Sequence, residues 1–187
     1  SMFIQALYNV VDSMFVSYIS EAALTAVSLA YPMQNLMIAV ATGTGVGVNA
    51  LLSRNLGEKN YSMANRVAGN AIFLGLVSYV VFVLLGLLGS RFYFSVQVED
   101  PNIIALGHDY LSIVTVLSIG CFGQVLLSRL LQSTGKTFYS MVIQMVGAGL
   151  NLVLDPIMIF GLLGFPKMGV AGAALATVIS QLAGTAL

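Results

Sequence analysis

The sequence predicts an all-α fold, a polytopic bundle of six transmembrane helices, on three observations. Of the 187 residues, 58% are hydrophobic and only 7% are charged, whereas a soluble domain carries about 25% charged residues. The mean hydropathy is +0.95. Apolar runs of about 20 residues, long enough to cross a bilayer, alternate with short polar clusters. We therefore expect a multi-pass membrane protein in which residues 1–187 form one six-helix unit.

The first three helices are expected at residues 1–19, 25–53 and 66–95. The first lacks a basic segment and a small-residue cleavage site, so we interpret it as a mature helix and not as a signal peptide. It ends at Ser20-Glu21. The second is followed by the polar run 54–65, which we expect to connect it to the third. The third ends before the acidic break Glu99-Asp100-Pro101.

The last three helices are expected at residues 102–132, 138–160 and 170–187. The turn 133–136 closes the fourth. The fifth has a length of about 34 Å at 1.5 Å per residue, which matches the membrane. The loop 161–169 separates it from the sixth, which is still apolar at Leu187.

Basic residues in the short loops predict the orientation, because cytoplasmic loops carry an excess of Lys and Arg. The loops after the second and fourth helices share one side of the membrane and hold five basic residues, Arg54, Lys59, Arg66, Arg129 and Lys136. The opposite loops hold two, Arg91 and Lys167. We expect the N-terminus in the cytoplasm and both Asp12 and Asp155 in the outer half of the membrane.

Two aspartates inside apolar helices are the most informative feature of the chain. An ionised carboxylate in hydrocarbon costs roughly 2.5 to 3.5 kcal/mol, so such residues normally face a protein interior or a water-filled cavity. Asn9 precedes Asp12 by three residues and Asn151 precedes Asp155 by four. These spacings place each amide on the same helix face as its acid. The alternative for Asp12 is an interhelical hydrogen bond that only holds helices together.

Pro156 directly follows Asp155. Proline has no N–H to give to the carbonyl of Leu152, so we expect the helix to bend there and leave a carbonyl oxygen near Asn151 and Asp155. Carboxylate, amide and carbonyl oxygens suit a sodium ion or a proton relay. The alternative is that Asp155 caps a broken helix or pairs with a basic residue.

Other chemistries are poorly represented. The net charge is zero, which gives no indication of a nucleic-acid partner. One histidine, His108, and one cysteine, Cys121, lie far apart and predict neither a zinc site nor a nucleophilic triad; we expect His108 to be solvated at the interface. The glycines at 43–47 lie within an apolar helix, and Gly135-Lys136-Thr137 lacks the glycine that a phosphate-binding loop needs at Leu130. We expect no catalytic residues and no enzyme.

Five segments taken together resemble the multidrug and toxic compound extrusion (MATE) transporters. They are Tyr8 to Asp12 ahead of Phe15-Val16-Ser17, Ser53 to Glu58, Leu131 to Lys136, Asn151 to Pro156, and Gly169 to Ala174. The resemblance implies one six-helix lobe, the N-terminal one, of a two-lobe transporter, and therefore a C-terminal lobe as its partner. It also implies the inner membrane as location, and exchange of sodium or proton entry for export of mostly cationic, amphipathic drug-like compounds.

By this resemblance, Asp12 on the first helix and Asn151 and Asp155 on the fifth form the cation site of the lobe. Thr177 corresponds to a hydroxyl ligand on the sixth. The expected coupling ion is Na⁺ or H⁺, with sodium held at Asp12, Asn151 and Asp155, and no other cofactor is expected. Two alternatives stay open, a lipid-linked-sugar flippase of the same superfamily and a membrane scaffold that does not transport.

Overall fold

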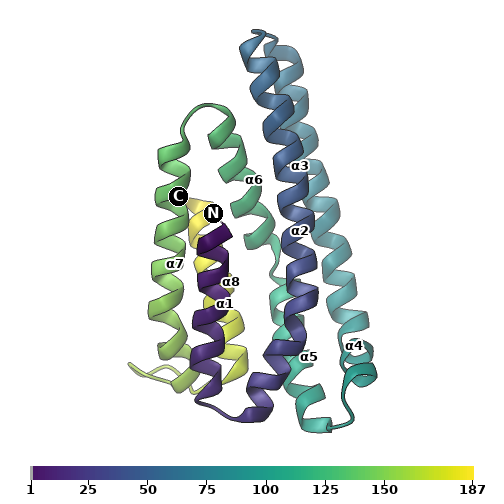
Figure 1. Ribbon diagram of the computed structural model, residues 1–187, viewed down its shortest axis with the longest axis vertical. Helices are drawn as coiled ribbons and strands as arrows, with labels where there is room; N and C mark the ends of the chain where they lie inside the picture. The colour runs from purple at the N-terminus through teal and green to yellow at the C-terminus, as the bar shows by residue number, and fades with distance from the viewer. Residues whose placement is uncertain (1) are drawn as a thin grey trace.

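The computed structural model describes residues 2–187, except for the side chains of Met2, Ile4, Gln5, Tyr8 and Asn9. Within these residues the chain is helical with short connections (Figure 1). The elements in chain order are α1 (Met2–Ser17), α2 (Glu21–Gly57), α3 (Tyr61–Leu84), the π-helical turn η1 (Leu85–Gly89), α4 (Ser90–Gln97), α5 (Pro101–Val116), α6 (Ile119–Ser133), α7 (Thr137–Phe160) and α8 (Val170–Ala186).

These elements group into six passes over the described residues, which confirms the expected fold class. The elements α3, η1 and α4 follow one another without a break, and α5 and α6 meet at a bend of 43°. Three helical stretches are long and apolar enough to cross a membrane, namely Glu21–Gly57, Tyr61–Gln97 and Thr137–Phe160; the bent pair of α5 and α6 meets the same criterion when it is taken as one span. The chain is a multi-pass membrane protein.

The polar run 54–65 is not the long connection that hydropathy suggested. Helix α2 continues to Gly57, and α3 already begins at Tyr61, where Asn60 Oδ1 accepts the backbone N–H of Met63 at 3.2 Å. Hydropathy marks where an apolar run ends, but α2 continues beyond that point and α3 begins before its apolar run, at the cap formed by Asn60. With 37 residues, α2 is about 55 Å long, well above the roughly 30 Å of hydrocarbon.

The start of α2 also differs from its expected position, residue 25. It begins at Glu21, because the hydroxyl of Ser20 accepts the N–H of Ala23 at 3.0 Å and caps the first turn. The connection between α1 and α2 is therefore a short turn of residues 18–20.

The single helix expected at 102–132 is wrong, because α5 and α6 are separated at Leu117 and Ser118. The hydroxyl of Thr115 donates to the carbonyl of Leu111 at 2.7 Å, a back-bond that often bends helices. Thr115 also packs against Gly86 of η1, where a Cβ would lie 2.6 Å from the Cβ of Thr115. The end of α5, next to the bend, therefore packs directly against the π-helical turn η1.

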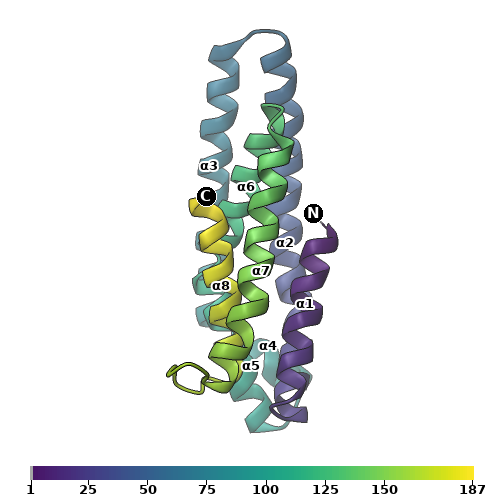
Figure 2. The same cartoon turned by 90° about the vertical axis from the view of Figure 1, so that its left-hand side faces the viewer.

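Figures 1 and 2 show the connections gathered at two ends of the bundle. The α2–α3 and α6–α7 hairpins lie at one end, with the α2–α3 hairpin reaching further. The connections α1–α2, α4–α5 and α7–α8 lie at the other. The five basic residues of the expected cytoplasmic loops lie on or near the first two hairpins, and the orientation itself remains a prediction.

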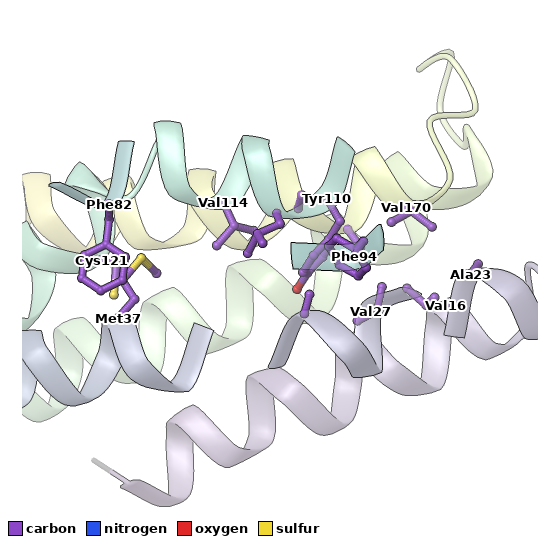
Figure 3. Packing of buried hydrophobic residues seen from close by; sticks show 14 of the residues in the cluster. Val16, Ala23, Val27, Met37, Phe82, Phe94, Tyr110, Val114, Cys121 and Val170 are labelled. Carbon is purple, nitrogen blue, oxygen red and sulfur yellow. The ribbon is translucent and has the colours of Figure 1, made fainter. Parts of the chain in front are cut away.

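The core consists of apolar side chains between the passes (Figure 3). Tyr110 and Phe94 are fully buried, and Cys121 lies beside Phe82 and Met37. By contrast, α3, η1 and α4 leave many large apolar side chains exposed, among them Leu88 at 79%. An exposed apolar face of this extent fits a helix that contacts lipid.

His108, which we expected to be solvated at the interface, keeps part of its surface exposed and also has a partner inside the bundle. It is half-buried on α5, and its Nδ1 lies 2.6 Å from the hydroxyl of Ser90. The π-helical turn before α4 shifts the helix register at the point where Ser90 follows, a feature that the sequence does not signal.

Candidate cation site

Three helices that are distant in the sequence bring the four expected site residues together. Asp12 lies on α1, Asn151 and Asp155 lie one turn apart on α7, and Thr177 lies on α8. Each is buried, with at most 2% of its surface exposed.

Gly172 sets the approach of α8 to α7. A Cβ at this position would lie 2.5 Å from the carbonyl oxygen of Met158. Because the atom in the way is backbone, a side chain at Gly172 would force the two helices apart. The small residues near the start of α8 therefore determine how close Thr177 comes to Asn151 and Asp12.

Thr177 links the two carboxyl groups through hydrogen bonds. Its hydroxyl donates to Oδ2 of Asp12 at 3.0 Å and accepts from Nδ2 of Asn151 at 3.4 Å. The same amide nitrogen of Asn151 donates to Oδ1 of Asp155 at 3.2 Å. The chain of contacts thus runs from α1 through α8 to α7.

One oxygen of each acid accepts no hydrogen bond from the described residues, namely Oδ1 of Asp12 and Oδ2 of Asp155. The two carboxyl groups are also near enough for the charge of Asp12 to act on Asp155. Two ionised carboxylates side by side in a buried site repel each other and lose their hydration. A proton or a cation between them relieves both effects.

The donor set fits a hard monovalent ion or a proton. The described residues include no group of three or more His, Cys, Asp or Glu side chains that could hold a metal, whereas carboxylate, amide and hydroxyl oxygens are ligands for hard cations. In the arrangement observed, Asn151 Nδ2 and the Thr177 hydroxyl point hydrogen atoms at the carboxylates. That arrangement suits a proton shared between two acids, and sodium would use the same oxygens.

Two further expectations concern Asn9, as a partner of Asp12, and Pro156, as the position of a bend. The side chain of Asn9 lies outside the described residues, so its pairing with Asp12 stays a prediction. Pro156 lies inside α7, which continues as helix to Phe160.

Sequence reasoning missed two buried polar residues beside the site: Tyr110, which contacts Asp12, and Gln34, which contacts Tyr110. The hydroxyl of Tyr110 on α5 lies 3.5 Å from Asp12 Oδ2 and 3.4 Å from Oε1 of Gln34 on α2. A tyrosine in an apolar helix, such as Tyr110, gives no sequence signal of a polar contact. Gln34 carried a usable signal, since it is an amide two residues after Pro32 within a long apolar helix.

The chain resembles known proteins over nearly its whole length. The MatE family model matches residues 1–157. The chain is 31% identical over 190 residues to a protein named FAD transporter from Shewanella oneidensis, covering 96% of this chain and 40% of the relative. It is 27% identical over 184 residues to a probable multidrug resistance protein NorM from Thermotoga maritima, covering 98% of this chain and 40% of the relative. The chain thus spans about 40% of the length of these relatives.

Solved structures agree with the fold. One, described as the inward-facing conformation of a multidrug resistance MATE family transporter of the MOP superfamily, superimposes with a TM-score of 0.90 at 28% identity, covering 97% of this chain and 40% of that one. The outward-facing conformation of such a transporter gives 0.89 at 29% identity, covering 99% and 40%. The similarity to an inward-facing and to an outward-facing structure is therefore nearly equal.

Proposed function

Because the chain belongs to the MatE family, we propose that it is the cation-binding lobe of a secondary transporter that exports drug-like molecules in exchange for protons or sodium. The observation that carries the proposal is the buried pair Asp12 and Asp155, which Thr177 and Asn151 connect across three helices. A cation stabilises two buried acids that lie close together, whereas an ordinary apolar core contains no group that binds one.

The coupling follows from where the two acids lie. Asp12 belongs to α1 and Asp155 to α7, so a movement of α1 against α7 changes the distance between their free oxygens. A cation held by both oxygens stabilises the conformation in which they are close. A ligand shifts a conformational equilibrium only by its difference in affinity for the two states. The coupling therefore arises because the affinity for the cation depends on the distance between the two carboxyl oxygens.

The similar TM-scores with inward- and outward-facing structures support a lobe that changes little internally while the transporter changes its access. We propose that the lobe tilts nearly as a unit and that local movement is confined to helices at the site. Following the loop charges, we propose that the N-terminus lies in the cytoplasm. Following the family, we propose the inner membrane as the location.

Amphipathic, mostly cationic compounds are the first substrate candidate, supported by the relative described as a probable multidrug resistance protein. A second candidate is FAD, supported by the relative named FAD transporter. The two differ in charge, because FAD carries two phosphates, so competition between a cationic dye and FAD separates them.

The experiment uses the full-length protein in inverted vesicles, with a sodium gradient and then a pH gradient imposed. We expect drug transport to follow one gradient and to collapse in Asp155→Asn. Asp109→Asn, a change of an exposed aspartate on α5, is the matched control and retains transport. Transport that needs neither gradient, or an Asp155→Asn variant equal to wild type, contradicts the proposal.

A further inference from the structure

Two hydroxyl groups contact the same oxygen of Asp12, and each has a second acceptor. The Thr177 hydroxyl lies 3.0 Å from Asp12 Oδ2 and 3.0 Å from the carbonyl of Ala173. The Tyr110 hydroxyl lies 3.5 Å from Asp12 Oδ2 and 3.4 Å from Gln34 Oε1. A hydroxyl carries one hydrogen, so neither residue can donate to both of its acceptors at once.

The charge of Asp12 decides which acceptor receives the hydrogen. A hydrogen bond to an ionised carboxylate is roughly twice as strong as one to a neutral oxygen. With Asp12 ionised, both hydroxyls donate to Oδ2. When a proton or cation neutralises Asp12, this advantage is lost: Thr177 turns to Ala173 on its own helix, and Tyr110 turns to Gln34 on α2.

Gln34 lies two residues after a proline, Pro32, inside α2. Pro32 has no N–H to donate to the carbonyl of Ser28, so one backbone hydrogen bond is missing there. Side chains tie this segment to its neighbours: Tyr93 of α4 donates to the carbonyl of Leu29 at 2.9 Å, and Tyr31 is hydrogen-bonded to Ser13 of α1.

Among these ties, the Tyr110–Gln34 bond differs in one respect. Its donor is shared with Asp12, and both Tyr110 and Gln34 are buried, with 0% and 4% of their surfaces exposed. Figure 3 shows the Tyr110 hydroxyl at the α2 side of the core. The other titratable groups that act on Asp12 from the described elements are Asp155 on α7 and Tyr31 on α2.

We propose that Tyr110 is a two-position donor and Gln34 a positioning residue that together transmit neutralisation of Asp12 to the Pro32 segment of α2. This inference rests on the proposed cation coupling and extends it to a second helix. Cation binding frees the Tyr110 hydrogen for Gln34, which adds a tie between α5 and α2. Release of the cation removes that tie and allows the proline segment to change its bend.

The test measures the distance between spin labels on α2 and α7 of the full-length protein. Leu51→Cys and Met145→Cys place labels on exposed positions, in a background without other reactive cysteines. We expect the distance distribution of wild type to change when the coupling cation, H⁺ or Na⁺, is added. Gln34→Met keeps the side-chain length without the amide oxygen, and we expect it to remove this change.

Gln144→Met is the matched control, because Gln144 is a half-buried amide on α7 that donates to Ser140 and not to the Asp12 network. It retains the cation-dependent change. Tyr110→Phe removes the shared donor and is the second variant. We expect it to lose the cation-dependent change in label distance, as Gln34→Met does. It provides the test of the inference if Gln34→Met does not fold. A change of distance in both variants equal to that of wild type overturns the inference.

The outcomes also separate this inference from the proposed function. If Asp155→Asn abolishes gradient-driven transport but the wild-type label distance does not respond to the cation, the Tyr110–Gln34 inference is wrong and the coupling proposal stands. If transport in Asp155→Asn is unchanged, the coupling proposal fails, and the inference that rests on it fails too.

Discussion

The hydroxyl of Thr177 donates to Oδ2 of Asp12 at 3.0 Å, although 165 residues separate the two in the sequence. The bond joins the first helix of the chain to the last, directly beside the Asn151–Asp155 pair of α7. The candidate site is therefore a contact between passes and not a property of any one helix.

Replacing Thr177 by valine removes the hydroxyl with little change in shape. A hydrogen bond to a charged group contributes about 1.5–3 kcal/mol, so we expect cation-driven transport by the full-length protein to fall by about tenfold or more. Thr177→Ser restores most of it. The control is Thr185→Val, also on α8, whose hydroxyl bonds to Gly120 and Gln181 carbonyls. Equal transport rates for Thr177→Val and wild type would show that the bridge is dispensable.

Gly172→Ala should disturb the site without touching any of its polar groups. The added Cβ would meet the Met158 carbonyl at 2.5 Å, so α8 must shift away from α7. We expect a loss of about 1–3 kcal/mol, as is typical of overpacking, measured as a lower denaturation midpoint in detergent. Gly149→Ala on α7 meets no atom within 4 Å and should be neutral or stabilising. Similar effects of the two changes would refute this account of Gly172.

The loop charges predict which end of the bundle faces outward, and labelling can test this. We expect Leu162→Cys, in the connection before α8, to react with a membrane-impermeant thiol reagent added to intact cells. Tyr61→Cys, at the tip of the α2–α3 hairpin, should react only after permeabilisation. Both positions are exposed, at 50% and 62%, so access to each depends on the side of the membrane. The reverse pattern would invert the predicted orientation.

Ser20 caps α2, and its loss should be measurable. Ser20→Ala leaves the N–H of Ala23 without its acceptor, and we expect about 1 kcal/mol lower stability of the full-length protein. Ser95→Ala, at an exposed position where the hydroxyl bonds to the carbonyl of Phe92, is the matched control and should have little effect. If Ser20→Ala lowers the stability no more than Ser95→Ala does, packing alone determines where α2 starts.

The sequence marked both acids of the candidate site, because a carboxylate in an apolar helix is rare for a physical reason. Asp12 and Asp155 could be found from hydropathy alone, and the spacing of four predicted that Asn151 would lie on the face of Asp155. Thr177 needed the family resemblance, since a single hydroxyl in a membrane helix has a self-contained alternative in its own backbone, here the carbonyl of Ala173.

Sequence patterns did not assign Tyr110 or Gln34 to the site, although Gln34 carried a signal as an amide inside a long apolar helix. Neither α2 nor α5 carries a buried acid among the described residues, and the contact of Tyr110 with Gln34 depends on how α5 packs against α2. The same holds for the fold: the six passes follow from apolar runs, but the η1 turn and the α5–α6 bend arise from tertiary contacts such as Thr115 against Gly86. Hydropathy also cannot locate a helix end that lies outside the apolar region, as at Gly57.

The length of α2 has a mechanical consequence. From Pro32 to Gly57 the helix extends about 37 Å as a stiff rod. A rotation of about 10° at the proline would carry the tip of the hairpin through roughly 6 Å, since displacement grows with the length of the arm. A small change in the bend of α2 at Pro32 therefore produces a large displacement at the tip of the projecting α2–α3 hairpin.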